Sequence, residues 1–124
     1  MARPRPKYLD LLRIRLPLPA LVSILHRISG AVLFLSIPFL LWLFQSSLES
    51  PESFAQFKAG LSHWAVKLAL IGLLWAYLHH LCAGIRHLAL DLQYGTELAA
   101  ARATSKAVLA ASIGFTVVAA AVLW

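Results

Sequence analysis

The segment LALIGLLWAYLHHLCAGIRHLALD, residues 68–91, begins as an uninterrupted apolar run and ends with histidines, an arginine and an aspartate. From Leu68 to Ile85 it contains no Asp, Glu, Lys or Arg. At about 1.5 Å per helical residue, this run approaches the thickness of about 30 Å of a bilayer core. Two further uncharged runs, Ile28–Leu48 and Ala107–Trp124, have the same character. The sequence therefore predicts three transmembrane helices.

The composition supports this interpretation, because 60% of the residues are hydrophobic and only 13% are charged. The chain has a single cysteine, so neither an intrachain disulfide nor a multi-cysteine metal site is possible within it. We expect an all-α membrane protein consisting of one membrane-anchor domain over residues 1–124. The expected helices cover about residues 21–47, 62–90 and 104–124.

The distribution of Lys and Arg predicts the orientation of the helices. The N-terminus and the loop after the second helix lie on the same side of the membrane, and nine of these residues are found there: Arg3, Arg5, Lys7, Arg13, Arg15, Arg27, Arg86, Arg102 and Lys106. The opposite side has only two, Lys58 and Lys67. The positive-inside rule then predicts a cytoplasmic N-terminus. The basic charge reflects topology rather than nucleic-acid binding. The proline-rich residues before Ala20 are expected to form an interfacial arm, lying on lipid headgroups or against a soluble partner.

One stripe of the second helix carries polar groups into the membrane. Tyr77, His80, Gly84, His87 and Asp91 follow helical spacings of three and four residues, whereas His79 points about 100° away from His80. His80 lies about 10 Å deeper than His87. Ionisable residues at such depth usually face protein or water and mark functional sites.

The imidazole of His80 has two possible roles. It could hydrogen-bond to a neighbouring helix as a packing contact. It could instead bind a metal, with Gly84 allowing a flat macrocycle to approach the backbone. Zinc is disfavoured because it needs three or four convergent ligands, and His79 and His80 diverge. Haem needs only one or two axial ligands.

The first helix carries a second polar group of residues, in the stretch SILHRISG. Ser23, His26, Arg27 and Gly30 share a face near the cytoplasmic boundary. Arg27 could simply extend to the headgroups. Alternatively, His26 and Arg27 could bind an anion such as a haem propionate, while Ser23 or Arg27 donates to the carbonyl of a ligand.

Together, RPKYLDLLRIRLPLPALVSILHRISG (residues 5–30) and HLCAGIRHLALD (residues 80–91) resemble the cytochrome b membrane-anchor subunit of bacterial succinate dehydrogenase, respiratory complex II. The motifs are S-x-x-H-R-x-S and H-x-x-x-G-x-R-H-x-x-x-D, and the resemblance covers nearly the whole chain. It implies a multi-pass protein of the bacterial inner membrane that acts in electron transport and the tricarboxylic acid cycle. Succinate oxidation would occur on other subunits.

The resemblance also implies cofactors, partners and site residues. One haem b would be shared with a second small anchor subunit, and ubiquinone would be reduced beside the iron-sulfur subunit, which is joined to a flavoprotein subunit. His80 would be the axial ligand of the haem iron, and His26 and Arg27 would contact the propionates. Ser23 and Arg27 would line the quinone pocket. Gly84, His87 and Asp91 are expected to have supporting roles.

The positions of the histidines add an inference of their own. A second axial ligand must lie at the depth of His80 on a facing helix, but His26 is near the interface and His63 is at the other membrane end. The third predicted helix has no histidine. The chain therefore needs a second subunit to complete a six-coordinate haem. Leu90 departs from the motif, where an aromatic residue or methionine is expected, and this affects the expected local packing.

Two alternative functions remain at this point. A fumarate reductase anchor, with or without haem, would run the reaction in the opposite direction, and His80 argues against the haem-free form. A small transporter or channel subunit would also consist of apolar helices. Such a protein would more often carry Asp or Glu at mid-membrane, and the predicted helices have none there.

Overall fold

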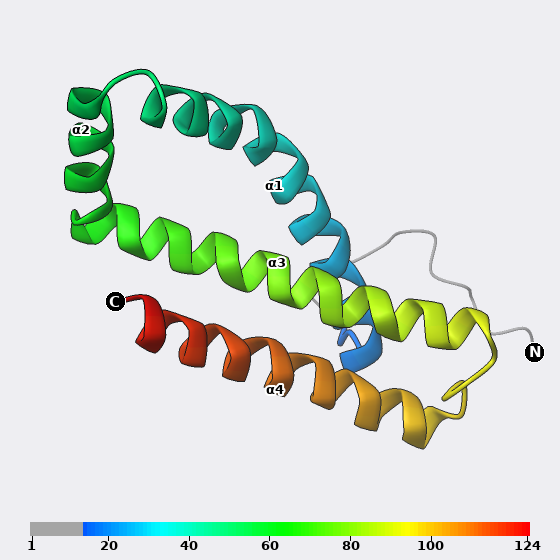
Figure 1. Cartoon of the computed structure of the whole chain (residues 1–124). Helices are drawn as coiled ribbons and strands as arrows, with labels where there is room; N and C mark the ends of the chain where they lie inside the picture. The colour runs from blue at the N-terminus through cyan, green and yellow to red at the C-terminus, as the bar shows by residue number, and fades with distance from the viewer. Residues whose placement is uncertain (1–13) are drawn as a thin grey trace, which may run out of the picture.

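The computed structural model describes residues 14–124, which form helices joined by short turns (Figure 1). These are α1 (Leu18–Ser47), α2 (Pro51–Leu61), α3 (Trp64–Asp91) and α4 (Leu98–Leu123). Three of them, α1, α3 and α4, are long and apolar enough to cross a membrane. The all-α fold with three spans is thus confirmed. Most of the predicted N-terminal arm lies outside the described residues, and the cytoplasmic N-terminus stays a prediction.

Helix α1 begins at Leu18, slightly before the predicted start near residue 21. Pro17 is its N-cap and Pro19 lies in its first turn, where a missing N–H breaks no helical hydrogen bond. Pro38 lies inside the helix, which continues to Ser47. α1 and α3 lie close together near the start of α1 and diverge toward α2 (Figure 1).

The segment after α1 falls between the predicted helices 21–47 and 62–90, but it contains the helix α2. Ser50 caps this helix: its side chain accepts a hydrogen bond from the backbone N–H of Ser53, and the Ser53 side chain accepts one from the N–H of Ser50. Pro51 occupies the first turn. This capping box and the proline together favour a helix start. α3 then begins at Trp64, close to the predicted residue 62.

The turn between α3 and α4 is shorter than expected. The backbone N–H of Tyr94 donates to the Ala89 carbonyl at 2.9 Å, and that of Gln93 donates to the Leu90 carbonyl at 2.9 Å. With Gln93 at φ 65°, this is a Schellman ending of a helix. α4 therefore starts at Leu98 rather than near residue 104.

α3 packs against both α1 and α4, and the small core of the bundle lies between them. Val22 of α1, Ala83 of α3 and Val108 of α4 form this core. The buried hydroxyls of Ser112 and Thr116 donate to backbone carbonyls one turn earlier in α4, so they can be buried without unpaired donors. Most large apolar side chains are exposed on the outside of the helices. Such surfaces suit lipid or neighbouring membrane subunits.

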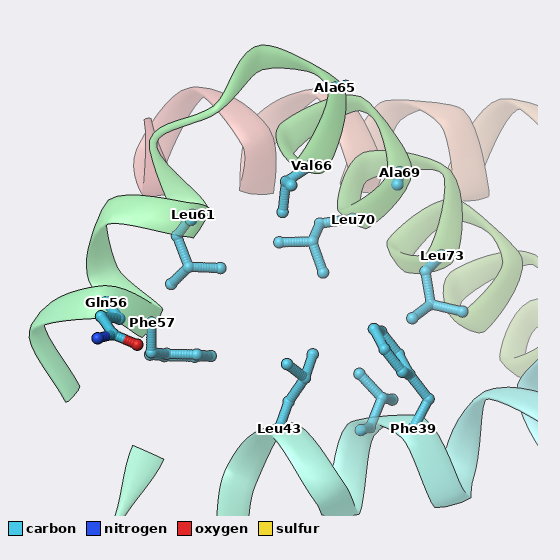
Figure 2. A pocket seen from close by; sticks show the side chains of 12 residues that line it. Phe39, Leu43, Gln56, Phe57, Leu61, Ala65, Val66, Ala69, Leu70 and Leu73 are labelled. Carbon is cyan, nitrogen blue, oxygen red and sulfur yellow. The ribbon is translucent and has the colours of Figure 1, made fainter. Parts of the chain in front are cut away.

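Where α1 and α3 diverge, they enclose a hollow of about 520 Å³ together with α2. Its lining is apolar except for Gln56, and Figure 2 shows Phe39, Leu43, Leu61 and Leu73 around it. This hollow lies at the N-terminal end of α3. The polar stripe lies in the other half of that helix.

Candidate functional site

The imidazole of His80 is held by the facing helix α1. Its Nδ1 lies 3.0 Å from the carbonyl oxygen of His26 and 3.2 Å from Oγ of Ser29. The Ser29 hydroxyl in turn donates to the same His26 carbonyl at 2.9 Å. Because a carbonyl oxygen can only accept, Nδ1 carries the proton and Nε2 keeps its lone pair. A histidine that ligates a metal through one nitrogen is usually oriented in this way by its other nitrogen.

Gly30 provides the space that His80 needs. A Cβ atom at Gly30 would lie 2.9 Å from Cε1 and 3.3 Å from Nδ1 of His80. The first distance is shorter than real Cβ contacts allow, so His80 would have to shift. This contact was not predicted from the sequence, whereas the approach of a macrocycle to the backbone at Gly84 stays a prediction. A Cβ at Gly84 would make an ordinary contact of 3.6 Å with Nε2 of His26.

Three imidazoles gather where α1 crosses α3. The rings of His26 and His80 are stacked, with centroids 4.1 Å apart and an interplanar angle of 8°. The ring of His87 lies 4.8 Å from that of His26 and is tilted by 57°. Stacking covers one face of the His80 ring, but Nε2 offers its lone pair in the ring plane. His26 therefore supports the orientation of His80 without blocking ligation. The prediction that His26 lies nearer the interface than His80 is wrong, because α1 crosses α3 at this point and brings the two rings to the same depth.

An open groove of about 440 Å³ runs along these histidines. His26, His80, Gly84 and His87 line it together with apolar side chains, which are Leu81, Ile85 and Leu88. Three residues of the predicted stripe, His80, Gly84 and His87, thus line one surface of α3, whereas Tyr77 and Asp91 do not line this groove. A groove with a few imidazoles in an apolar wall is suited to a flat apolar cofactor with polar edges.

His79 lies in the interior of the bundle, away from the groove. It is fully buried, and among residues 14–124 neither of its ring nitrogens has a hydrogen-bond partner. The indole of Trp75 lies beside it, with ring centroids 5.3 Å apart. The separation of His79 from His80 thus follows the predicted 100° rotation. Within the described residues, no group of three His, Cys, Asp or Glu side chains could hold a metal ion.

The remaining predicted site residues lie around this cluster rather than in it. Arg27 is exposed and Ser23 is half-buried on α1, three residues or fewer from His26. Asp91 is exposed at the last position of α3. The structure thus brings together His26, His80, Gly84 and His87, and leaves Ser23, Arg27 and Asp91 at its borders. Sequence analysis missed Ser29 as a partner of His80, although its spacing of three from His26 was a usable signal.

The residues present fit a haem. His80 has an imidazole oriented through Nδ1, the rest of the groove wall is apolar, and Arg27 is an exposed cation that follows His26 in α1. These features match the axial ligand, the ring faces and the propionates of a haem, respectively.

Comparison with known proteins identifies the family. The model for the succinate dehydrogenase/fumarate reductase transmembrane subunit matches residues 1–119. The chain belongs to this family. It is 41% identical over 122 residues to the succinate dehydrogenase cytochrome b556 subunit of Coxiella burnetii, covering 97% of each chain. The subunit of the same name from Paracoccus denitrificans is 38% identical, covering 80% of this chain and 76% of the relative.

A third relative extends this pattern. The succinate dehydrogenase cytochrome b556 subunit of Rickettsia felis is 32% identical over 111 residues, covering 90% of this chain and 85% of the relative. The resemblance to a bacterial membrane-anchor cytochrome b of succinate dehydrogenase is therefore confirmed. The chain is a membrane subunit of an oxidoreductase complex, and this family assignment argues against the transporter or channel alternative.

Proposed function

We propose that this subunit anchors succinate dehydrogenase in the bacterial inner membrane, binds haem b through His80 and forms part of the site that reduces ubiquinone. The observation that carries the proposal is the contact of His80 Nδ1 with the His26 carbonyl at 3.0 Å. This contact favours the tautomer with the proton on Nδ1, which leaves the lone pair of Nε2 available to the iron. The names of the relatives, cytochrome b556 subunits, support a b-type haem.

His80 would bind the iron, and Arg27 and His26 would meet the propionates at the cytoplasmic end of the groove. The donation from Nδ1 to a carbonyl makes Nε2 more basic and holds the ring in one orientation. When bound, the haem supplies a one-electron redox centre. Gly84 and His87 would border it along α3, in a supporting role with Asp91.

The second axial ligand would come from another anchor subunit. Two other histidines of the described helices lie near the depth of His80, and neither suits the second ligand. His79 is one residue away on the same helix and turned into the core. His26 stacks its ring on that of His80 at 4.1 Å, which leaves no space for a haem between the two rings. A second small membrane subunit would cover the open groove and contribute a histidine from the facing side. The iron-sulfur and flavoprotein subunits would then sit on the cytoplasmic face, where electrons from succinate enter.

Ser23 and Arg27 would line the quinone pocket beside the iron-sulfur subunit. Reduction of a quinone to a quinol takes two electrons and two protons. A hydroxyl and a guanidinium can donate hydrogen bonds to the quinone carbonyls and so stabilise the negative charge that develops on them. Surrounding apolar residues would exclude bulk water from the pocket, which strengthens these hydrogen bonds.

Reduced-minus-oxidised absorption spectra of the assembled complex test the haem assignment. We expect His80→Leu to remove or severely change the b-type band, because the axial ligand is lost. His79→Leu is the matched control, because the same substitution is made at the neighbouring position, where the side chain points into the core and away from the groove. An unchanged band in the His80 variant would rule out this residue as the ligand.

A further inference from the structure

Arg86 is a buried cation on the side of α3 that faces α4. Its side chain is only 8% exposed. Nε donates to Oγ1 of Thr104 at 3.1 Å, and Nη2 donates to the carbonyl oxygen of Ala101 at 3.4 Å. Both partners are neutral, and they engage two of the five N–H donors of a guanidinium. Burial of a guanidinium is costly unless its remaining N–H donors also find partners.

A second hollow, of about 230 Å³, lies beside this guanidinium between α3 and α4. Arg86, Tyr94 and Thr104 provide its polar lining, and no acidic residue is among the lining side chains. The rest of the wall is apolar or weakly polar: Cys82, Ile85, Ala89, Leu90, Ala107 and Val108. The volume is several times the share of about 30 Å³ that one water molecule takes in the liquid. The hollow can therefore hold a polar group larger than water.

This α3–α4 hollow and the histidine groove open on different sides of α3, and only Ile85 lines both of them. Cys82 and Gly84 differ by about 200° around α3, since each residue turns the helix by about 100°. Asp91, nine residues after Cys82, also projects from the opposite side of α3 by the same rule. The acid at the end of the helix is therefore poorly placed to neutralise Arg86.

The depth of the hollow matches a lipid headgroup region. Arg86 lies five residues before the end of α3 at Asp91, which is about 7.5 Å along the helix axis. Tyr94 lies beyond that end, in the turn. Tyrosine side chains favour the level of the headgroups, and arginine side chains extend toward it. The cationic end of the hollow thus lies near the interface, while its apolar wall continues toward the acyl chains.

We propose that the α3–α4 hollow binds an anionic phospholipid through its phosphate. Arg86 donates its remaining N–H groups to the phosphate oxygens, a pairing that suits the planar fork of a guanidinium. The hydroxyl of Tyr94 donates a further hydrogen bond, and Ala89 and Ala107 leave room for the glycerol and the upper acyl chains. The lipid would thereby neutralise the buried cation and hold α3 and α4 together at their turn.

Lipid retention by the complete complex tests this proposal. The complex is reconstituted with an equal mixture of phosphatidylglycerol and phosphatidylcholine, then purified in mild detergent, and retained lipids are counted by native mass spectrometry. We expect Arg86→Gln to lower retained phosphatidylglycerol at least fivefold without changing phosphatidylcholine. Arg102→Gln is the matched control, because it removes an exposed cation of the same helix pair and should retain phosphatidylglycerol.

A second variant keeps the charge and fills the hollow. Ala89→Leu should also lower phosphatidylglycerol retention, and it decides the question if Arg86→Gln does not assemble. Retention at the wild-type level in the assembled variants would overturn the proposal. Displacement of the lipid by millimolar inorganic phosphate would point to a free-anion site instead. If Arg86→Gln lost another subunit but retained the lipid, Arg86 would be assigned to a protein contact. Displacement by phosphate and loss of a subunit would each overturn the lipid site.

Discussion

At Gly30, a single methyl group decides whether His80 can keep its position. Gly30→Ala would place Cβ at 2.9 Å from Cε1 of His80, and an imidazole that is held at Nδ1 cannot move without losing that hydrogen bond. We expect the b-type band of the assembled complex to weaken or shift. The measurement is absorbance per complex, checked by electron paramagnetic resonance of the oxidised form.

Gly114→Ala provides the matched control, because nothing lies within 4 Å of a Cβ at that position in α4. Alanine is favoured over glycine in a helix by about 1 kcal/mol, so this variant should be neutral or slightly more stable. An unchanged spectrum in Gly30→Ala would mean that the two helices separate easily at this point. The orientation of His80 would then not depend on α1.

Ser23 and Arg27 call for an assay that separates quinone chemistry from succinate oxidation. We expect Ser23→Ala to lower succinate-driven ubiquinone reduction at least tenfold, while reduction of an artificial acceptor by the soluble subunits stays near wild type. Arg27→Leu should behave similarly, with an added change in the haem spectrum if this residue also contacts a propionate. Equal losses in both assays would indicate faulty assembly rather than a quinone-site defect.

The histidines illustrate what helical spacing can predict. The 100° step between neighbouring residues separated His79 from His80 correctly, because it depends only on the geometry of one helix. The partners of His80 depend on how α1 crosses α3, and spacing within one helix contains no information on that crossing. For this reason the contacts of Ser29 and Gly30 with His80 were not predicted.

Among the elements, helix α2 was not predicted, although the capping box at Ser50 and Ser53 marks its start. Its eleven residues are too few for a membrane span and too polar for an apolar stripe to stand out. The start of α4 was placed too late because Arg102 was assigned to a loop, whereas a helix tolerates it on an exposed face. Long apolar runs therefore predict spans well, and the charged or short segments next to them need capping signals to be assigned.

Ser50→Ala tests whether the capping box holds α2 in place. Loss of an N-cap side chain costs about 1 kcal/mol, so the amides of the first turn should exchange with solvent about fivefold faster. Hydrogen exchange of the complex, followed by mass spectrometry of peptides covering α2, measures this. Ser47→Ala is the control, since that hydroxyl donates to the Phe44 carbonyl at the end of α1 and caps no helix start. Equal exchange in both variants would mean that packing against α1 and α3 alone holds α2.

At the scale of the whole molecule, the small core contrasts with the large apolar exterior. The bundle buries Val22, Ala83 and Val108 at its centre, while most large apolar side chains lie outside and the histidine groove is open. The acyl chains of lipids can cover an apolar surface, but they provide no hydrogen-bond partners or ligands for imidazoles. A neighbouring protein with polar groups of its own suits this groove better than lipid does.

The last prediction is that the chain produced alone does not form a low-spin, bis-histidine haem, and does so when produced together with its second anchor subunit. The two axial ligands bind opposite faces of one ring, so their imidazoles must approach the iron from opposite sides at similar depth. His79 cannot provide the second ligand, because it lies on the same helix as His80 and is fully buried in the core. His26 is also unsuited, since its ring stacks parallel to that of His80 at 4.1 Å and leaves no space for a porphyrin between them. Electron paramagnetic resonance and absorption spectra of the purified, monodisperse chain, with and without the second subunit, measure this directly. A bis-histidine signal from the isolated monomer would require His26 or His87 to leave its present position, and would contradict the shared-haem proposal.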